Sequence, residues 1–96
     1  MGKPAARMGD FHVCPKSSGS GDHKGGPVLD GSKTILIGSR PAASVGAHCA
    51  CNGATDTVMR GSTTVLVGGR PAARIGDATA HGGVISEGKR TVLIGG

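Results

Sequence analysis

Apolar residues gather in short segments, and nowhere do they recur with helical spacing. Three apolar triplets, each preceded by threonine and followed by glycine, occupy residues 35–37, 65–67 and 92–94. A pair of apolar residues precedes each triplet, with a glycine-containing turn sequence between the two. β-Branched runs bounded by glycine are typical of buried strands. We therefore predict an all-β fold in which each pair and the triplet after it form a short hairpin.

A second phrase, basic residue-Pro-Ala-Ala, recurs in phase with the triplets. It opens residues 3–10, 40–47 and 70–77, and each copy runs on through a polar and an apolar position to glycine. The last triplet has no such phrase after it, whereas the first phrase has no triplet before it. Three complete units arise only if the two ends of the chain meet. The repeats therefore predict a closed ring of three hairpin units about a pseudo-three-fold axis.

Composition predicts a thin core that needs a staple. The 96 residues, which we expect to form a single domain without a fused effector domain, include 19 glycines and one aromatic residue, Phe11. Domains of this size with little apolar bulk commonly rely on disulfides or a metal. The formal net charge of +5 is spread through the repeats, whereas nucleic-acid binding favours clustered charge or aromatic platforms. We therefore expect no nucleic-acid partner.

The N-terminal residues lack the apolar stretch of a signal peptide or a membrane span. We therefore expect the protein to be made and first kept in the cytoplasm, where thiols stay reduced. An odd number of cysteines also argues against a closed disulfide framework. Metal ligation is the use of these cysteines that we predict.

Every histidine and cysteine lies in one of the three loops that follow the repeated phrases. They are His12, Cys14 and His23 in the first loop, His48, Cys49 and Cys51 in the second, and His81 in the third. Equivalent loops of a three-fold ring converge on its axis, so these side chains can meet at one apex. A structural zinc ion takes four nitrogen or sulfur ligands in a tetrahedron. The pattern predicts one such ion as the staple.

Two other interpretations belong to different functional classes. A catalytic site could use Asp10, His12 and Cys14, or His48 with Cys49 as a nucleophile pair. No cleft-forming scaffold is evident, and the repeat symmetry accounts for the cysteines without catalysis, so we expect no enzyme. A zinc-binding module for nucleic acid would favour paired Cys-x-x-Cys sequences, and this chain has only Cys-Ala-Cys.

The repeated Pro-Ala-Ala-Arg phrase, the Thr-Val-Leu-Ile-Gly phrase and the His-Val-Cys-Pro sequence after the first copy resemble the PAAR-repeat proteins of type VI secretion systems and contractile phage tails. The resemblance covers the whole chain. It implies a small cone of short strands, with an apex zinc held by three histidines and one cysteine. Ser44 and Ala47 depart from the pattern, because they replace the arginine and aspartate of the other two copies.

The resemblance also implies a function. We expect a non-enzymatic spike-tip protein whose base caps a trimeric valine–glycine-repeat spike, one copy per trimer. It would sharpen the spike for membrane piercing, contact the target membrane transiently, carry effector proteins as further partners and be exported on the spike. The alternative is the tip of a contractile phage tail or phage-like particle, with a nucleic-acid-binding zinc module less favoured.

Two arguments select different metal ligands. Five residues beyond the glycine of each phrase, strict repeat register selects Cys14, Cys51 and His81. The resemblance instead implies His12, His23, Cys51 and His81, and we follow it because the lengthened first loop need not keep register. Cys14 is then interpreted as a small buried hydrophobe, with His48 and Cys49 as neighbours of the site. Iron is the competing ion, because this ligand set does not exclude it.

Overall fold

A computed structural model describes residues 2–14, 17–18, 21–22, 25–51 and 54–96 of the chain. These residues form short strands and turns, so the all-β prediction is confirmed. The strands are β1 (Lys3–Ala5), β2 (Phe11–Val13), β3 (Ser17–Ser18), β4 (Gly21–Asp22), β5 (Gly26–Pro27), β6 (Leu36–Ile37), β7 (Arg40–Pro41), β8 (His48–Cys51), β9 (Ala54–Thr57), β10 (Leu66–Val67), β11 (Arg70–Pro71), β12 (Val84–Ile85) and β13 (Lys89–Ile94). Within these ranges there is no helix of the length and apolarity that crossing a membrane requires.

The first two apolar triplets pair with the basic phrase that follows them, and not with the preceding apolar pair as predicted. Strand β6 pairs with β7, and β10 pairs with β11, in both cases antiparallel. Both central residues of each connecting turn have positive φ, at Gly38 and Ser39 in the first and at Gly68 and Gly69 in the second. Turns of this kind match the right-handed twist of hairpin strands. The predicted pairing of each triplet with the preceding apolar pair is therefore wrong.

The glycine that was expected to turn the hairpin serves a different purpose. A Cβ atom on Gly31 would collide with Pro41, and one on Gly61 would lie 2.7 Å from the carbonyl oxygen of Ala72. Glycine at these positions allows two backbones to approach closely, which a larger residue would prevent. The turn sequence therefore marks a contact between segments.

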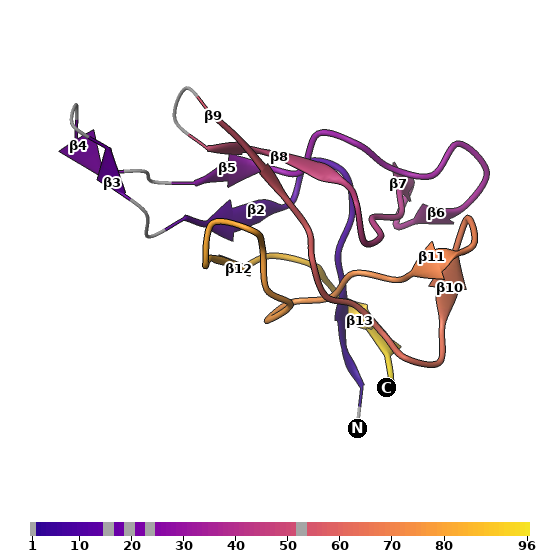
Figure 1. Ribbon diagram of the computed structural model, residues 1–96. Coiled ribbons are helices and arrows are strands. Elements are labelled where there is room, and N and C mark those ends of the chain that lie inside the picture. The colour runs from indigo at the N-terminus through magenta and orange to yellow at the C-terminus, as the bar shows by residue number, and fades with distance from the viewer. Residues whose placement is uncertain (1, 15–16, 19–20, 23–24, 52–53) are drawn as a thin grey trace.

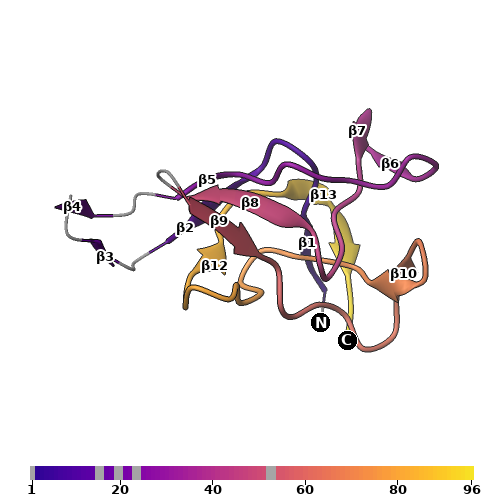
Figure 2. The same ribbon diagram turned by 45° about the horizontal axis from the view of Figure 1, so that its top comes forward.

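The third hairpin joins the two ends of the described chain. Strand β13 pairs antiparallel with β1, with Lys3 opposite Ile94 and Pro4 opposite Leu93. The two termini lie side by side in both ribbon views (Figures 1 and 2). The last triplet and the first basic phrase thus form the same antiparallel pair as β6–β7 and β10–β11, without a connecting turn. The predicted closed ring is confirmed.

Alanines surround the pseudo-three-fold axis of the ring. The amide of Ala6 donates to the carbonyl oxygen of Ala73 at 2.9 Å, Ala73 donates to Ala43 at 2.9 Å, and Ala43 donates back to Ala6 at 3.0 Å. The alanine before each of them, at positions 5, 42 and 72, is buried as well. Three backbones can close such a ring only if the side chains between them are small, which explains why each phrase carries two alanines.

Each of these two alanine layers belongs to a small core. One contains Val28, Val58 and Ile85, the first or second member of each apolar pair, together with Cys49. The other contains Val67 and Ile94 from the triplets. The molecule measures 38 × 25 × 22 Å. Strands β2, β5, β8, β9 and β12 lie toward one end, the apex, and hairpins β6–β7 and β10–β11 lie toward the other, the base (Figures 1 and 2).

Candidate metal site

Three equivalent turns carry the chain from the axis to the apex. The amides of Gly9, Gly46 and Gly76 donate to the carbonyl oxygens of Val28, Val58 and Ile85 at 2.8, 2.9 and 2.8 Å. These glycines have φ values of 93°, 94° and 90°, in a backbone region that residues other than glycine rarely adopt. The apex segments therefore leave the axis in the same direction, and repeat register continues into the loops.

Register brings three apex residues together. The structure joins Cys14 and Cys51 in a disulfide with a Cα–Cα distance of 6.4 Å. The Cys14 sulfur lies 3.6 Å from Nδ1 of His81. The expectation that these cysteines form no disulfide is therefore wrong for this pair. Cys14 is buried as predicted, but it is bonded to Cys51 and does not act only as a small apolar side chain.

His12 lies in β2 with its ring fully buried. Its Nδ1 lies 2.9 Å from the carbonyl oxygen of Gly26, and its Nε2 lies 3.1 Å from a carboxylate oxygen of Asp56. Both neighbours are hydrogen-bond acceptors, while a neutral imidazole carries one N–H group. With Nδ1–H donating to the carbonyl, Nε2 keeps the lone pair that a metal ion would need.

Asp56, in β9, is a member of the apex cluster that the sequence analysis missed. Its Oδ1 accepts hydrogen bonds from the backbone amides of Thr57 and His81 at 2.8 and 2.9 Å. Burial by itself raises the pKa of Asp56, but hydrogen bonds from the Thr79 side chain and these two amides hold it below its ordinary value. Its pairing with Cys49 across β8 and β9 exists only in the folded chain, so no signal in the sequence pointed to it.

The three described members of the predicted ligand set meet around Cys14. Potential ligand atoms of His12, Cys14 and Cys51 lie within 4.8 Å of one another, and so do those of Cys14, Asp56 and His81. His23 lies outside the described residues. Imidazole nitrogen and cysteine sulfur are the ligands that a structural zinc site uses, so the donor set fits this metal. A cysteine in a disulfide offers no thiolate, so metal binding requires the reduced protein.

The alternative nucleophile pair is poorly arranged for catalysis. Burial, with smaller effects from Asp56 and Asp30, raises the pKa of Cys49 to about 12. A thiol with this pKa stays protonated near neutral pH and is a weak nucleophile. The neighbouring His48 is exposed, with its Nδ1 2.6 Å from the Asp30 carboxylate. Successive residues of a strand point to opposite faces, which separates the two side chains.

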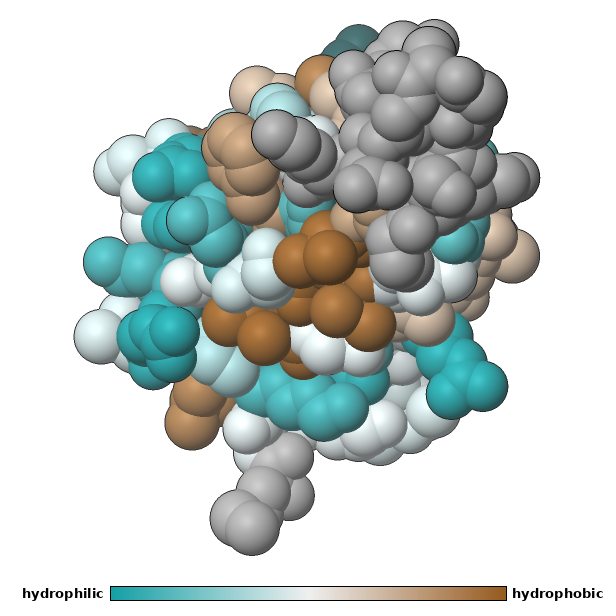
Figure 3. All heavy atoms as spheres, turned by 90° about the vertical axis from the view of Figure 1, so that its left-hand side faces the viewer, coloured by the Kyte–Doolittle hydropathy of each residue, from teal (hydrophilic) through white to brown (hydrophobic). Residues whose placement is uncertain are grey.

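The apex face also carries apolar side chains, whose patch is visible at the centre of Figure 3. Val13 and Val84 lie opposite one another across β2 and β12, and both are exposed. The apex of the cone is therefore partly apolar where the described residues reach its surface.

The opposite end carries three leucines related by the pseudo-three-fold axis. Leu36, Leu66 and Leu93, the central residues of the triplets, are 62%, 60% and 60% exposed. We call these residues the base triad. The triplets were predicted to be buried strands, but only their third residues turn into the core. Near-identical exposure at three positions shows that the repeat symmetry extends to this surface.

A closed ring of three β repeats, with a histidine–cysteine apex and a three-fold apolar base, defines a class of small, pointed β proteins. Residues 18–87 match the family model of the PAAR motif, and the chain belongs to this family of structural spike-tip proteins. A comparison with curated proteins found no match. The family resemblance seen in the repeated phrases is thus confirmed.

Proposed function

We propose that this protein caps the trimeric valine–glycine-repeat spike of a type VI secretion system, one copy per trimer. The base triad is the observation that carries the proposal. The end of a homotrimer presents three identical surfaces and three strand edges that need covering. The single chain supplies three equivalent leucines about its own axis, so each surface of the trimer can receive one.

The function that follows is mechanical. The cone extends the spike to a point whose exposed apex includes Val13 and Val84, and it carries effector proteins across the target membrane. We propose that the protein is made in the cytoplasm and leaves the cell on the spike. In this role the chain catalyses no reaction, and the closed hydrogen-bonded ring gives the tip its rigidity.

Mixing the purified protein with its cognate spike and measuring the mass of the complex by light scattering tests the proposal. We expect one chain per trimer. Leu36→Asp, Leu66→Asp and Leu93→Asp should each weaken the complex to a similar extent, because a carboxylate would enter an apolar contact. Leu29→Asp is the matched control, since Leu29 is also exposed but lies outside the triplets. Three chains per trimer, absence of a complex, or an equal loss with Leu29→Asp would overturn the capping role.

We also propose that the reduced protein holds one zinc ion at the apex through His12, His23, Cys51 and His81. Support comes from the meeting of His12, Cys51 and His81 around Cys14, and from the Gly26 carbonyl oxygen, which faces Nδ1 of His12 and leaves Nε2 for the metal. The ion would pin three loops together in a molecule with only small cores. Iron is the competing metal.

Metal content of protein from metal-replete cells, kept reduced, tests this site. We expect one zinc per chain and a large fall in melting temperature on chelation, because structural zinc supplies on the order of 10 kcal/mol in zinc-finger peptides. His12→Ala, Cys51→Ser and His81→Ala should lose the metal, whereas Cys49→Ser should retain it. Loss in Cys14→Ser with retention in His12→Ala would replace the proposed set by the register set. Absence of stoichiometric metal would refute the site.

A further inference from the structure

Three pseudo-equivalent pockets surround the ring. Each lies between the turn that ends one basic phrase and the hairpin region of a neighbouring repeat. Their volumes are about 320, 520 and 540 Å³ for the first, second and third phrases. The second pocket is therefore not distinguished by size. Its charges distinguish it.

In the first pocket the protein supplies its own carboxylate. Asp10 accepts hydrogen bonds from Nε and Nη2 of Arg7, each at 3.0 Å, and a further bond from Nη1 of Arg40 at 3.2 Å. Arg40 is the basic residue that opens the next phrase. The third pocket contains the equivalent pair, Arg74 and Asp77, with contacts of 3.0 and 2.9 Å. A buried carboxylate thus faces arginine in both pockets.

The second pocket keeps the backbone and the opening arginine but lacks the carboxylate. Ser44 and Ala47 replace the arginine and aspartate, yet the Ala47 amide still donates to the Ser44 carbonyl oxygen at 3.0 Å, as Asp10 does to Arg7. Arg70 takes the place of Arg40. A Cβ atom on Gly46 would lie 2.5 Å from Nη1 of Arg70, as one on Gly9 would lie 3.4 Å from Nη1 of Arg40.

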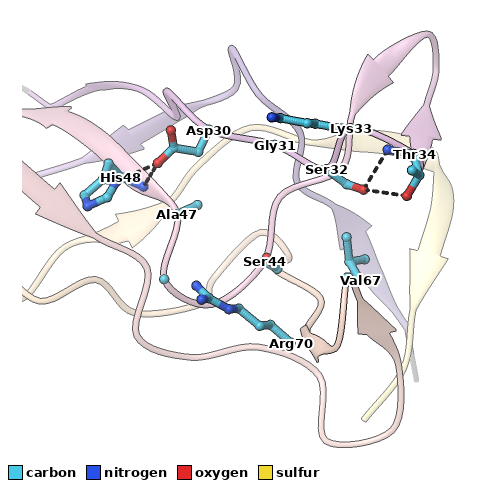
Figure 4. A pocket seen from close by; sticks show the side chains of 12 residues that line it. Asp30, Gly31, Ser32, Lys33, Thr34, Ser44, Ala47, His48, Val67 and Arg70 are labelled. Atoms are coloured by element: carbon cyan, nitrogen blue, oxygen red, sulfur yellow. Dashed lines mark hydrogen bonds and ion pairs between the residues drawn. The ribbon is translucent and has the colours of Figure 1, made fainter.

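Arg70 consequently lies beside the position of Ala47, where the first repeat has the carboxylate of Asp10. Its side chain extends toward the turn that carries Ala47, while Lys33 lies on the other side of the same pocket (Figure 4). Within the described part of the chain, no hydrogen bond or ion pair involves the guanidinium of Arg70. Asp30 also lines this pocket, but its carboxylate is engaged by the His48 amide at 2.8 Å and the His48 ring at 2.6 Å and takes no part in a contact with Arg70.

We propose that the second pocket binds an aspartate or glutamate side chain of a partner polypeptide, in the place that Asp10 occupies in the first repeat. The Arg70 guanidinium donates to the carboxylate, and the Lys33 ammonium adds a second positive charge. The Ser44 hydroxyl lines the space that an arginine fills in the other repeats. A single exposed ion pair contributes little in water, so an isolated carboxylate should bind weakly, and the backbone on either side of the acidic residue should add to the affinity. None of the base-triad leucines lines this pocket, although Val67 and Arg70 belong to the β10–β11 hairpin of the base.

Arginine side-chain NMR signals test the proposal directly. The probe is an acetylated and amidated Gly-Asp-Gly peptide, with Gly-Asn-Gly as its uncharged counterpart and free acetate as the small carboxylate. We expect the aspartate peptide to shift the Arg70 Nε–H signal saturably and more tightly than acetate does. The Arg40 signal should stay in place, because Asp10 already occupies its guanidinium.

Two variants sharpen the result. Arg70→Gln should weaken peptide binding at least about tenfold, the loss expected for a charge-assisted hydrogen bond. The double variant Ser44→Arg/Ala47→Asp should also abolish binding while leaving the fold intact, because it rebuilds the internal pair that Arg7 and Asp10 form in the first repeat. Arg40→Gln is the matched control and should bind the peptide normally. Equal shifts at Arg40 and Arg70, equal affinity for acetate and peptide, or unchanged binding in Arg70→Gln would each overturn the proposal.

Discussion

The turns at the ends of the first and third phrases are stabilised by buried arginine–aspartate pairs. In the third, the Asp77 carboxylate accepts hydrogen bonds from the Arg74 backbone amide and from two nitrogens of its guanidinium. The side-chain hydrogen bond to Asp77 raises the pKa of Arg74 further above its ordinary value. Ser44 and Ala47 show that the same turn also forms without any charge.

This internal comparison predicts how the third turn responds to mutation. Arg74→Ser leaves the Asp77 carboxylate buried without its partner and should destabilise the fold by roughly 3–5 kcal/mol. The double variant Arg74→Ser/Asp77→Ala reproduces the second repeat and should be more stable than this single variant. Urea unfolding of the three proteins measures the difference. A double variant less stable than Arg74→Ser would show that the pair does not act as a unit.

At the scale of elements, short strands are aligned by close backbone contacts. Gly83, the residue before β12, lies against the carbonyl oxygen of Val13, which ends β2. Its φ is not positive, so the requirement for glycine here is one of space. The β2–β12 pairing in turn places His12 opposite Ile85.

Gly83→Ala should therefore push β12 away from β2. The new Cβ would collide with a backbone oxygen, and crowding of this kind typically costs about 1–3 kcal/mol. Gly95→Ala is a suitable control, because a Cβ there meets nothing within 4 Å. Thermal unfolding should show a lower melting temperature for Gly83→Ala alone. Equal melting temperatures would mean that the apex strands can shift without cost.

At the scale of the whole molecule, the ring has three equivalent hairpins, one of which is formed by the two ends of the chain. Its strands, β13 and β1, pair as β10 pairs with β11. The strand pair at the two termini therefore has the same architecture as the pairs whose strands are joined by a turn. Stability resides in contacts between repeats, as the cyclic hydrogen bonds of the three axial alanines show.

A circular permutant tests this description. Joining the present ends by a short glycine linker and opening the chain between Gly68 and Gly69 should preserve the fold, because a Cβ on either glycine meets nothing within 4 Å. Opening it between Ala72 and Ala73 should prevent folding, because that peptide bond lies in the axial layers. Dispersion of the amide NMR spectrum distinguishes the outcomes. Loss of structure in the first permutant would show that the order of the repeats matters.

Sequence alone determined the repeat architecture of this protein. Phased copies of the basic-Pro-Ala-Ala phrase and of the triplets predicted an all-β ring with its ends together, and they carried the resemblance to PAAR proteins. These inferences succeed because a repeat is written locally along the chain, and each copy confirms the phase of the others. The same register also placed Cys14, Cys51 and His81 at equivalent positions, and the structure brings them together.

Tertiary structure decided which partner each segment has and which side chains face solvent. The forward pairing of the triplets, the exposure of the base triad and the membership of Asp56 in the apex cluster depend on residues from other repeats. An apolar residue looks the same in sequence whether it is buried in a core or exposed on the surface. The Cys14–Cys51 pairing likewise required the distance between two loops, which residue types cannot supply. Repetition determines the symmetry of this molecule, but only the closed ring determines what each symmetric position contacts.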